Sequence, residues 1–268
     1  MTTELAVPAG VIAAMCLTGL FSLLLPVGLA LFFRKRLRAR WRFFGLGCFI
    51  FPVFALGLEQ LGHVLLLRGP LGQTITGSLW LYALYGGLMA GLFEETGRLV
   101  AFKLAKGWKT SPQDALMYGA GHGGIEAVLI VGLTMAANIM LAMLLNQGGM
   151  AAVITVTGPI PDQTADALLA LGSTPAFMFF WSGFERLAAV GLHIALSVLV
   201  YAAVCQKGKG GWRWFAVAVG LHAMVDMLAV LLNSLLPTAV TEGAIALLTL
   251  GCLWLARRVY HGLAAEQA

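Results

Sequence analysis

Seven apolar segments, each long enough to cross a lipid bilayer, make up most of the chain. A membrane-spanning helix needs about 20 mostly apolar residues. The segments lie near residues 9–33, 43–66, 78–102, 114–145, 177–204, 213–236 and 240–258. Because 60% of the 268 residues are hydrophobic and only 11% are charged, no room remains for a sizeable soluble domain. The sequence therefore predicts an all-α polytopic membrane protein, a bundle of about seven transmembrane helices forming one integral-membrane domain over residues 1–268.

Basic residues are concentrated in alternate connections between these segments. They cluster at 34–42, 103–109, 207–213 and 257–258, and only Arg68 falls in a connection on the other side. Lysine and arginine near the ends of spanning helices stay in the cytoplasm, so the N-terminus is predicted outside and the C-terminus inside. The formal charge of +5 is then a topology signal and an attraction to the lipid bilayer, and no nucleic-acid partner is expected. The connection 147–176 contains no lysine or arginine, and it is expected outside as a linker, a re-entrant segment or a cover.

Two glutamates and an arginine interrupt the third apolar segment, in the sequence Gly91-Leu-Phe-Glu-Glu-Thr-Gly-Arg98. Each charge costs roughly 2.5–3.5 kcal/mol at the centre of a spanning helix, so such residues usually face a protein interior and mark function. On a helix both Glu94 and Glu95 can reach Arg98. One carboxylate is therefore expected to be held by the arginine and the other to accept a proton, with a purely structural ion network as the alternative.

Three histidines in later segments are expected at the depth of this motif. His122, His193 and His222 fall within roughly 6 Å of one another in depth by the helical rise, in the same half of the bilayer as Glu94. Glu126 and Asp226 each follow one of these histidines by one turn, on the same helix face. Glu185 lies nearer the outer face and is expected in a supporting, structural ion pair.

A carboxylate beside histidines in a secluded cavity suits the activation of water for hydrolysis. Two arrangements are open at this point. His122, His193 and His222 could hold Zn²⁺ with a free fourth position for water. Alternatively, without a metal, His122 and His222 could orient the water and stabilise an oxyanion while Glu94 takes the proton. The sequence has no HExxH motif, so an ordinary zincin is not indicated.

The order and spacing of these elements resemble a known superfamily of membrane-embedded proteases. The matching elements are Glu94-Glu-Thr-Gly-Arg98, then His122 with Glu126, then His222-Ala-Met-Val-Asp226. They are similar to the CPBP (CAAX-prenyl protease) and PrsW superfamily, and the elements Gly-His-Gly-Gly-Ile-Glu and Glu-Arg…His look most like its YhfC branch. The resemblance covers about half the chain, the motif-bearing helices near 78–236.

The resemblance implies that Glu94 is the general base, supported by Glu95 and Arg98, and that His122 and His222 are ligands of water or of an oxyanion. Asp226 takes the place of the polar residue after the last histidine. Two departures bear on the mechanism: the arginine is one residue closer to the glutamates than in prenyl proteases, and His193 is an additional histidine. The superfamily is labelled both metallo- and glutamic-type, and the extra histidine favours the metal option.

Together these features predict an intramembrane peptidase that hydrolyses a peptide bond of a membrane-associated or transmembrane substrate, in a prokaryotic cytoplasmic membrane. A proton- or metal-coupled transporter is the first alternative, but it would spread polar groups over the full membrane depth and show internal repeats. A seven-helix zinc lipid amidase is the second, and it would need histidines within the last span, which has none. The sequence names neither the substrate nor a prenyl requirement.

Overall fold

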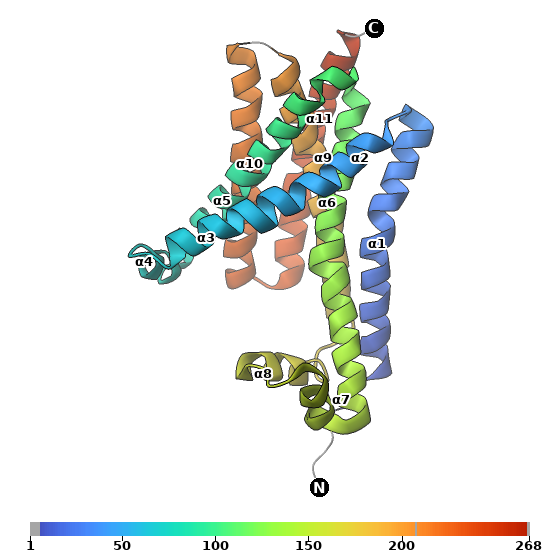
Figure 1. The fold of residues 1–268 in the computed structure, drawn as a ribbon, viewed down its shortest axis with the longest axis vertical. Helices are drawn as coiled ribbons and strands as arrows, with labels where there is room; N and C mark the ends of the chain where they lie inside the picture. Colours follow the sequence, from blue (N-terminus) through green and yellow to red (C-terminus); the bar gives the residue numbers. More distant parts are fainter. Residues whose placement is uncertain (1–5, 207, 267–268) are drawn as a thin grey trace. The chain divides into compact units, whose positions relative to one another are not determined.

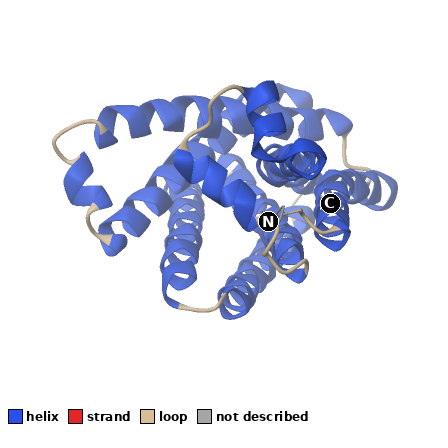
Figure 2. Ribbon diagram, turned by 90° about the horizontal axis from the view of Figure 1, so that it is seen from below, coloured by secondary structure: helices blue, strands red, loops and turns tan. Residues whose placement is uncertain are grey.

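The structure is a computed structural model that describes residues 6–206 and 208–266. Within these residues every regular element is a helix and no strand occurs, which confirms the predicted all-α class. Short connections join the helices (Figure 2). Lys207, one of the basic residues behind the orientation prediction, lies outside the described residues.

The helices are labelled in Figure 1. In chain order they are α1 (Ala9–Leu37), α2 (Trp41–Phe51), the π-helical η1 (Pro52–Glu59), α3 (Gln60–Leu67), α4 (Gly72–Thr76), α5 (Leu79–Leu104), the 3-10 turn η2 (Ala105–Trp108), α6 (Pro112–Ala127), the π-helical η3 (Val128–Gly132), α7 (Leu133–Thr157), α8 (Asp162–Ala170), α9 (Phe177–Cys205), α10 (Lys209–Leu235) and α11 (Thr238–Ala265).

Six helical stretches in the described part of the chain are long and apolar enough to cross a membrane. They are Ala9–Leu37, Trp41–Leu67, Pro112–Thr157, Phe177–Cys205, Gly210–Leu235 and Thr238–Ala265. The third predicted span corresponds to α5, which has 26 residues and carries Glu94, Glu95 and Arg98, and it is not among the six. The count of seven spans and the orientation of the termini therefore stay predictions.

Two features depart from the predicted helix boundaries. The second span contains π-helical turns that begin at Pro52; a proline removes a backbone donor inside a helix, so the regular ladder is locally rearranged. The predicted connection 147–176 is largely helical, because α7 continues to Thr157 across a kink at Gly148 and Gly149 and α8 follows. Glycine tolerates the positive φ of 62° at Gly149.

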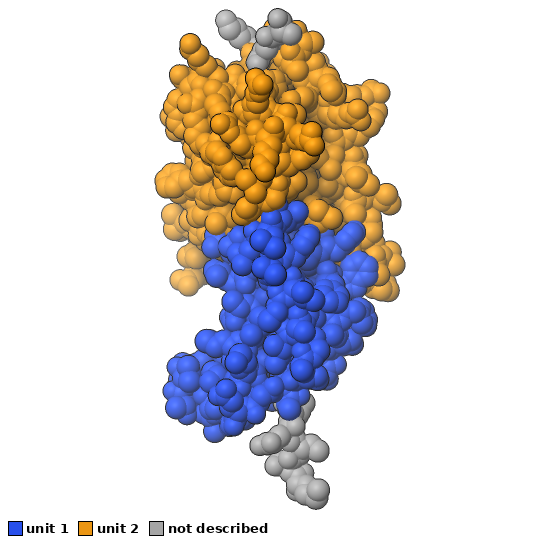
Figure 3. Space-filling model, turned by 90° about the vertical axis from the view of Figure 1, so that its right-hand side faces the viewer, with its two compact units in different colours: residues 1–25, 127–186 blue, residues 26–126, 187–268 orange. Residues whose placement is uncertain are grey.

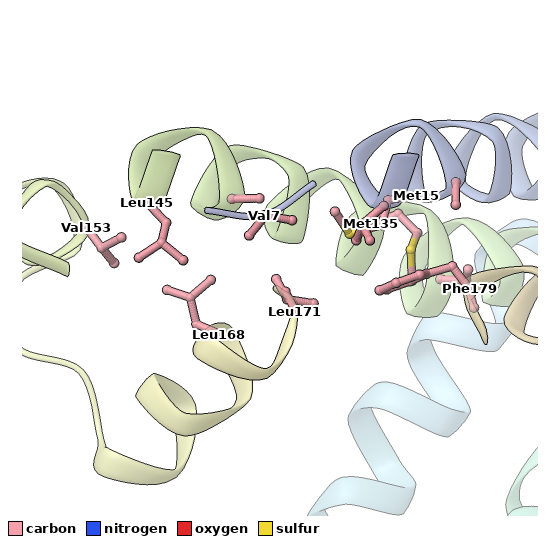
Figure 4. Close-up of a cluster of buried hydrophobic side chains, with 12 residues drawn as sticks. Val7, Met15, Met135, Leu145, Val153, Leu168, Leu171 and Phe179 are labelled. Carbon is pink, nitrogen blue, oxygen red and sulfur yellow. The ribbon is translucent and has the colours of Figure 1, made fainter. Parts of the chain in front are cut away.

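The chain divides into two compact units, residues 1–25 with 127–186 and residues 26–126 with 187–268 (Figure 3). The first, unit 1, has a core of buried apolar side chains that includes Val7, Met15, Met135 and Phe179 (Figure 4). Asn146 anchors the N-terminal segment within this unit, since its side chain accepts from the Val7 amide at 2.7 Å and donates to the Val7 carbonyl at 2.9 Å. The prediction of one domain stays a prediction.

The second unit, unit 2, is held together by close helix crossings at glycines. On α5, a methyl group at Gly87 would overlap the carbonyl oxygen of Ala223 in α10. On α6, a methyl group at Gly119 would lie 2.5 Å from the Cα of Ile194 in α9. Small residues let helix backbones approach each other in this way in membranes. As a result, side chains from α5, α6, α9 and α10 can meet in the interior of unit 2.

Candidate active site

The three charged residues of α5 are buried in unit 2. Glu94 is 7% exposed, and Glu95 and Arg98 are fully buried. A helical repeat of 3.6 residues points the two glutamates about 100° apart, so each meets different partners. Because isolated charges in a membrane interior are costly, the partners of each group indicate how it is stabilised.

Arg98 is bound to Glu95 rather than to Glu94. Its Nε lies 3.0 Å from Glu95 Oε2, and its Nη1 donates to the His193 carbonyl at 2.7 Å and to Ser197 Oγ at 2.5 Å. Ser197 in turn donates to the same carbonyl at 2.6 Å. A guanidinium has donors on both edges of its plane, so it can link α5 to α9 while it neutralises Glu95. This leaves Glu94 as the carboxylate without an arginine at ion-pair distance among the described residues.

Glu94 faces two histidines instead. Its Oε2 lies 2.9 Å from His122 Nε2 and 3.9 Å from His193 Nδ1. The two imidazole rings lie side by side, with centroids 4.8 Å apart. Both histidines are buried, at 0% and 3% exposed. The sequence led us to expect one glutamate bound to the arginine and one available to accept a proton. In the structure Glu95 is the bound one and Glu94 is the available one.

The proton on His193 can be placed from its neighbours. Arg98 Nη2 lies 3.0 Å from His193 Nδ1, and a guanidinium can only donate, so Nδ1 accepts. The neutral ring then carries its hydrogen on Nε2, which lies 2.5 Å from Glu126 Oε2. Glu126 was expected beside His122, its neighbour on α6. It contacts His193 because Gly123 on the same face admits the His193 ring, whose Cδ2 would lie 2.9 Å from a Cβ at that glycine.

His222 is held between two carboxylates. Its Nδ1 lies 2.8 Å from Glu95 Oε1, and its Nε2 lies 3.5 Å from Asp226 Oδ2 on the same helix. The His222 ring centroid is 5.4 Å from that of His193. The pairing with Asp226 agrees with the one-turn spacing in the sequence. The bond to Glu95 could not be read from the sequence, because it depends on the crossing of α5 and α10.

One group of three residues is arranged as metal ligands would be. Glu94, His122 and His193 each offer one ligand atom, and these atoms all lie within 4.8 Å of one another. The expected set was His122, His193 and His222. In the structure His222 is hydrogen-bonded to Glu95, and Glu94 is the third member of the group in place of His222. Two histidines and a glutamate form one of the ligand sets of catalytic zinc sites.

The surroundings of these histidines also fit a metal. Metal-bound histidines usually place their second ring nitrogen against an oxygen that fixes the tautomer. His122 Nδ1 lies 3.4 Å from Tyr118 Oη, and His193 Nε2 faces Glu126. The nitrogens that face Glu94 are Nε2 of His122 and Nδ1 of His193, and a metal ion would bind His193 Nδ1 in place of the hydrogen bond that this nitrogen accepts from Arg98 Nη2. The donor set and its outer contacts therefore fit a divalent metal.

A neighbouring polar cluster was missed by the sequence analysis. Glu59, at the end of η1, is 7% exposed, and its Oε1 lies 3.3 Å from His63 Nε2. His63 Nδ1 lies 2.7 Å from Tyr85 Oη on α5. The signal that could have indicated this cluster was a glutamate and a histidine four residues apart inside an apolar span.

The remaining predicted site residue, Glu185, lies in unit 1. It forms an ion pair with Arg186, as expected for a structural pair. The residues brought together within unit 2 are Glu94, Glu95, Arg98, His122, Glu126, His193, Ser197, His222 and Asp226.

These helices and this cluster define a polytopic membrane protein with a buried carboxylate–histidine centre that fits a metal ion. The chain belongs to the YhfC intramembrane metalloprotease family, whose model matches residues 21–246. It is 34% identical over 219 residues to the uncharacterized membrane protein YhfC of Bacillus subtilis (strain 168), covering 81% of this chain and 83% of that relative. No solved structure matches the chain. The protein is therefore an integral membrane protein of a bacterial cytoplasmic membrane.

Proposed function

We propose that this protein is an intramembrane peptidase that hydrolyses a peptide bond of a membrane-associated or transmembrane protein. The observation that carries the proposal is the buried contact of Glu94 with His122 and His193, at 2.9 and 3.9 Å, while Arg98 is bound to Glu95. A carboxylate placed between two histidines is suited to hydrolysis, because it can bind a metal ion or accept a proton from water. The family description supports the same class of reaction.

Glu94, His122 and His193 would hold the metal ion, with Zn²⁺ the ion that this donor set suits best. The ion would supply a polarising charge and an activated water near neutral pH. Glu126 fixes His193 in the tautomer that leaves Nδ1 free of a hydrogen. Arg98 holds the backbone of His193 and neutralises Glu95. Glu95 and Asp226 orient the His222 ring beside that of His193. To donate a hydrogen bond to a developing oxyanion, His222 Nε2 would exchange its contact of 3.5 Å with Asp226 for the substrate oxygen.

The experiment compares the wild type with Glu94→Gln in a bacterial strain that lacks the protein. New protein N-termini in purified membranes, measured by N-terminal peptide profiling, should appear with the wild type and be lost with Glu94→Gln. Loss of a positioned carboxylate should lower the cleavage rate by on the order of 10² to 10⁴-fold. Glu266→Gln, an exposed carboxylate near the end of α11, is the matched control. Cleavage that persists in Glu94→Gln at the wild-type rate would contradict the proposal.

Metal analysis of the purified variants separates the metal-assisted mechanism from the metal-free one. The ligand set expected from the sequence, His122, His193 and His222, would give metal loss in each of the three histidine variants and retention in Glu94→Gln. With Glu94 in the ligand group, we expect near-stoichiometric metal in the wild type, loss in Glu94→Gln, His122→Ala and His193→Ala, and retention in His222→Ala. A wild type that stays active after chelation, with no bound metal, would leave Glu94 as a glutamic-type base.

A further inference from the structure

A basic cavity lies at the end of unit 2 where α5 ends and α10 begins. Its volume is about 250 Å³, and its lining includes Lys103, Lys106, Gln206, Trp212 and Phe215. One water molecule needs only roughly 10–15 Å³ of such space, so the cavity admits a much larger group. The ends of α5 and α9 and the start of α10 lie at the same end of unit 2 as the C-terminal end of α11 (Figure 1).

The cavity carries two positive charges that the described part of the chain does not neutralise. Both lysines are exposed, and no described acidic side chain pairs with either of them. Lys103 Nζ lies 5.9 Å from the centroid of the Trp212 ring, a cation–π contact. Two ammonium groups at one cavity favour a ligand with several anionic oxygens.

Two aromatic side chains, Trp212 and Phe215, line the same cavity. Trp212 is 65% exposed, and Leu104, which follows the lining residue Lys103 on α5, is 74% exposed. At the end of a spanning helix such residues lie against lipid, and tryptophan is enriched at the depth of the headgroups. A ligand that satisfies both the lysines and these side chains has an anionic head and an apolar body. Basic pockets between membrane helices bind lipid headgroups in this way.

We propose that this cavity binds the headgroup of an anionic phospholipid, with Lys103 and Lys106 contacting the phosphate oxygens and an acyl chain lying along Trp212 and Leu104. The cavity also touches Leu99 and Ala203, which follow Arg98 on α5 and Ser197 on α9. A bound headgroup therefore links the helices that hold the candidate active site, and it stabilises unit 2 whether or not the protein is a peptidase.

The test measures thermal unfolding in nanodiscs of phosphatidylcholine, with and without phosphatidylglycerol. Because a ligand that binds only the folded state raises its stability, phosphatidylglycerol should raise the Tm of the wild type by at least about 2 °C. Lys103→Ala/Lys106→Ala should lose most of this rise, and Lys103→Arg/Lys106→Arg should keep it. The matched control is Lys35→Ala/Arg36→Ala, which removes two exposed basic side chains from the last turn of α1.

Native mass spectrometry of the same samples should show phosphatidylglycerol retained by the wild type and the control, and lost from the double alanine variant. The proposal is overturned if the double variant keeps the full rise in Tm and the bound lipid, or if the control loses them equally, which would indicate general surface charge. Inorganic phosphate is added to the phosphatidylcholine nanodiscs as a further arm. Stabilisation by phosphate but not by phosphatidylglycerol would assign the cavity to a soluble phosphate and overturn the lipid proposal.

Discussion

Arg98 is the residue that ties the charged motif of α5 to α9. It is fully buried and contacts Glu95, the His193 carbonyl, His193 Nδ1 and Ser197 Oγ. A lysine has the same charge but only one side-chain nitrogen, so it cannot contact all the groups that the two edges of the Arg98 guanidinium contact. The geometry of the arginine, as well as its charge, therefore supports the site.

We expect Arg98→Lys to lower the stability of the protein and reduce cleavage, because either Glu95 loses its ion-pair partner or the His193 carbonyl loses one of its two donors. Removing one partner of a buried pair costs about 3–5 kcal/mol, and the retained charge should keep the loss below that. Thermal unfolding in detergent and N-terminal profiling would measure the two effects. Arg257→Lys, at an exposed position on α11, should change neither. An Arg98→Lys variant with wild-type stability and activity would show that the second edge of the guanidinium is dispensable.

At this scale the sequence predicted which residues matter but not all of their partners. The spacing of Glu94, Glu95 and Arg98 on one helix predicted that one glutamate would be held by the arginine. Which one is held depends on α9, since Arg98 also contacts the His193 carbonyl and Ser197 Oγ and lies beside Glu95. Contacts between helices are not encoded in the periodicity of either helix, so the replacement of His222 by Glu94 in the ligand group could not be predicted.

The close crossing of α5 and α10 brings Glu95 on α5 into contact with His222 on α10. A methyl group at Gly87 would overlap the Ala223 carbonyl oxygen, whereas a methyl group at the adjacent Gly86 would have no atom within 4 Å. Ala223 follows His222 directly. We therefore expect Gly87→Ala to push α10 away and weaken the bond of 2.8 Å between His222 and Glu95.

The pair Gly87→Ala and Gly86→Ala tests this crossing with the same chemical change on neighbouring residues. Gly86→Ala should be neutral or slightly stabilising, because alanine favours a helix by about 1 kcal/mol over glycine. Gly87→Ala should be destabilising by roughly 1–3 kcal/mol, as for overpacked interiors, and should reduce cleavage. Thermal unfolding and N-terminal profiling measure both. Equal stability and equal cleavage in the two variants would mean that the position of α10 does not depend on this contact.

The helix boundaries show which local features are readable from an apolar sequence. Most helix ends were located to within about four residues, because apolar composition changes sharply there, but α11 continues to Ala265, beyond the predicted end at residue 258. The π-helical turns of η1 and η3 were not predicted, since a π-helix has the same composition as the helix around it. The end of α7 was placed too early, because Gly148 and Gly149 read as a turn whereas the helix continues beyond a kink.

For the whole molecule, the ends of the helices in unit 2 group the basic residues on one side. The end of α1, the connection from α5 to α6, the start of α10 and the end of α11 lie at one end of that unit (Figure 1), and the sequence places its lysine and arginine clusters there. A common side for these clusters agrees with the predicted alternation. The distribution of lysine and arginine predicts that this side of the membrane is the cytoplasmic side.

Cysteine labelling tests this orientation. In a variant whose four native cysteines, Cys16, Cys48, Cys205 and Cys252, are replaced, single cysteines are introduced at Gly107 and at Ser173, both exposed. Gly107 follows Lys106 in a basic connection, so its cysteine should react with a membrane-impermeant maleimide only after the cells are permeabilised. Ser173 lies in the connection without basic residues, so its cysteine should react in intact cells. Labelling of the Gly107 position from outside would reverse the predicted orientation and would place the lysine-lined cavity on the outer leaflet.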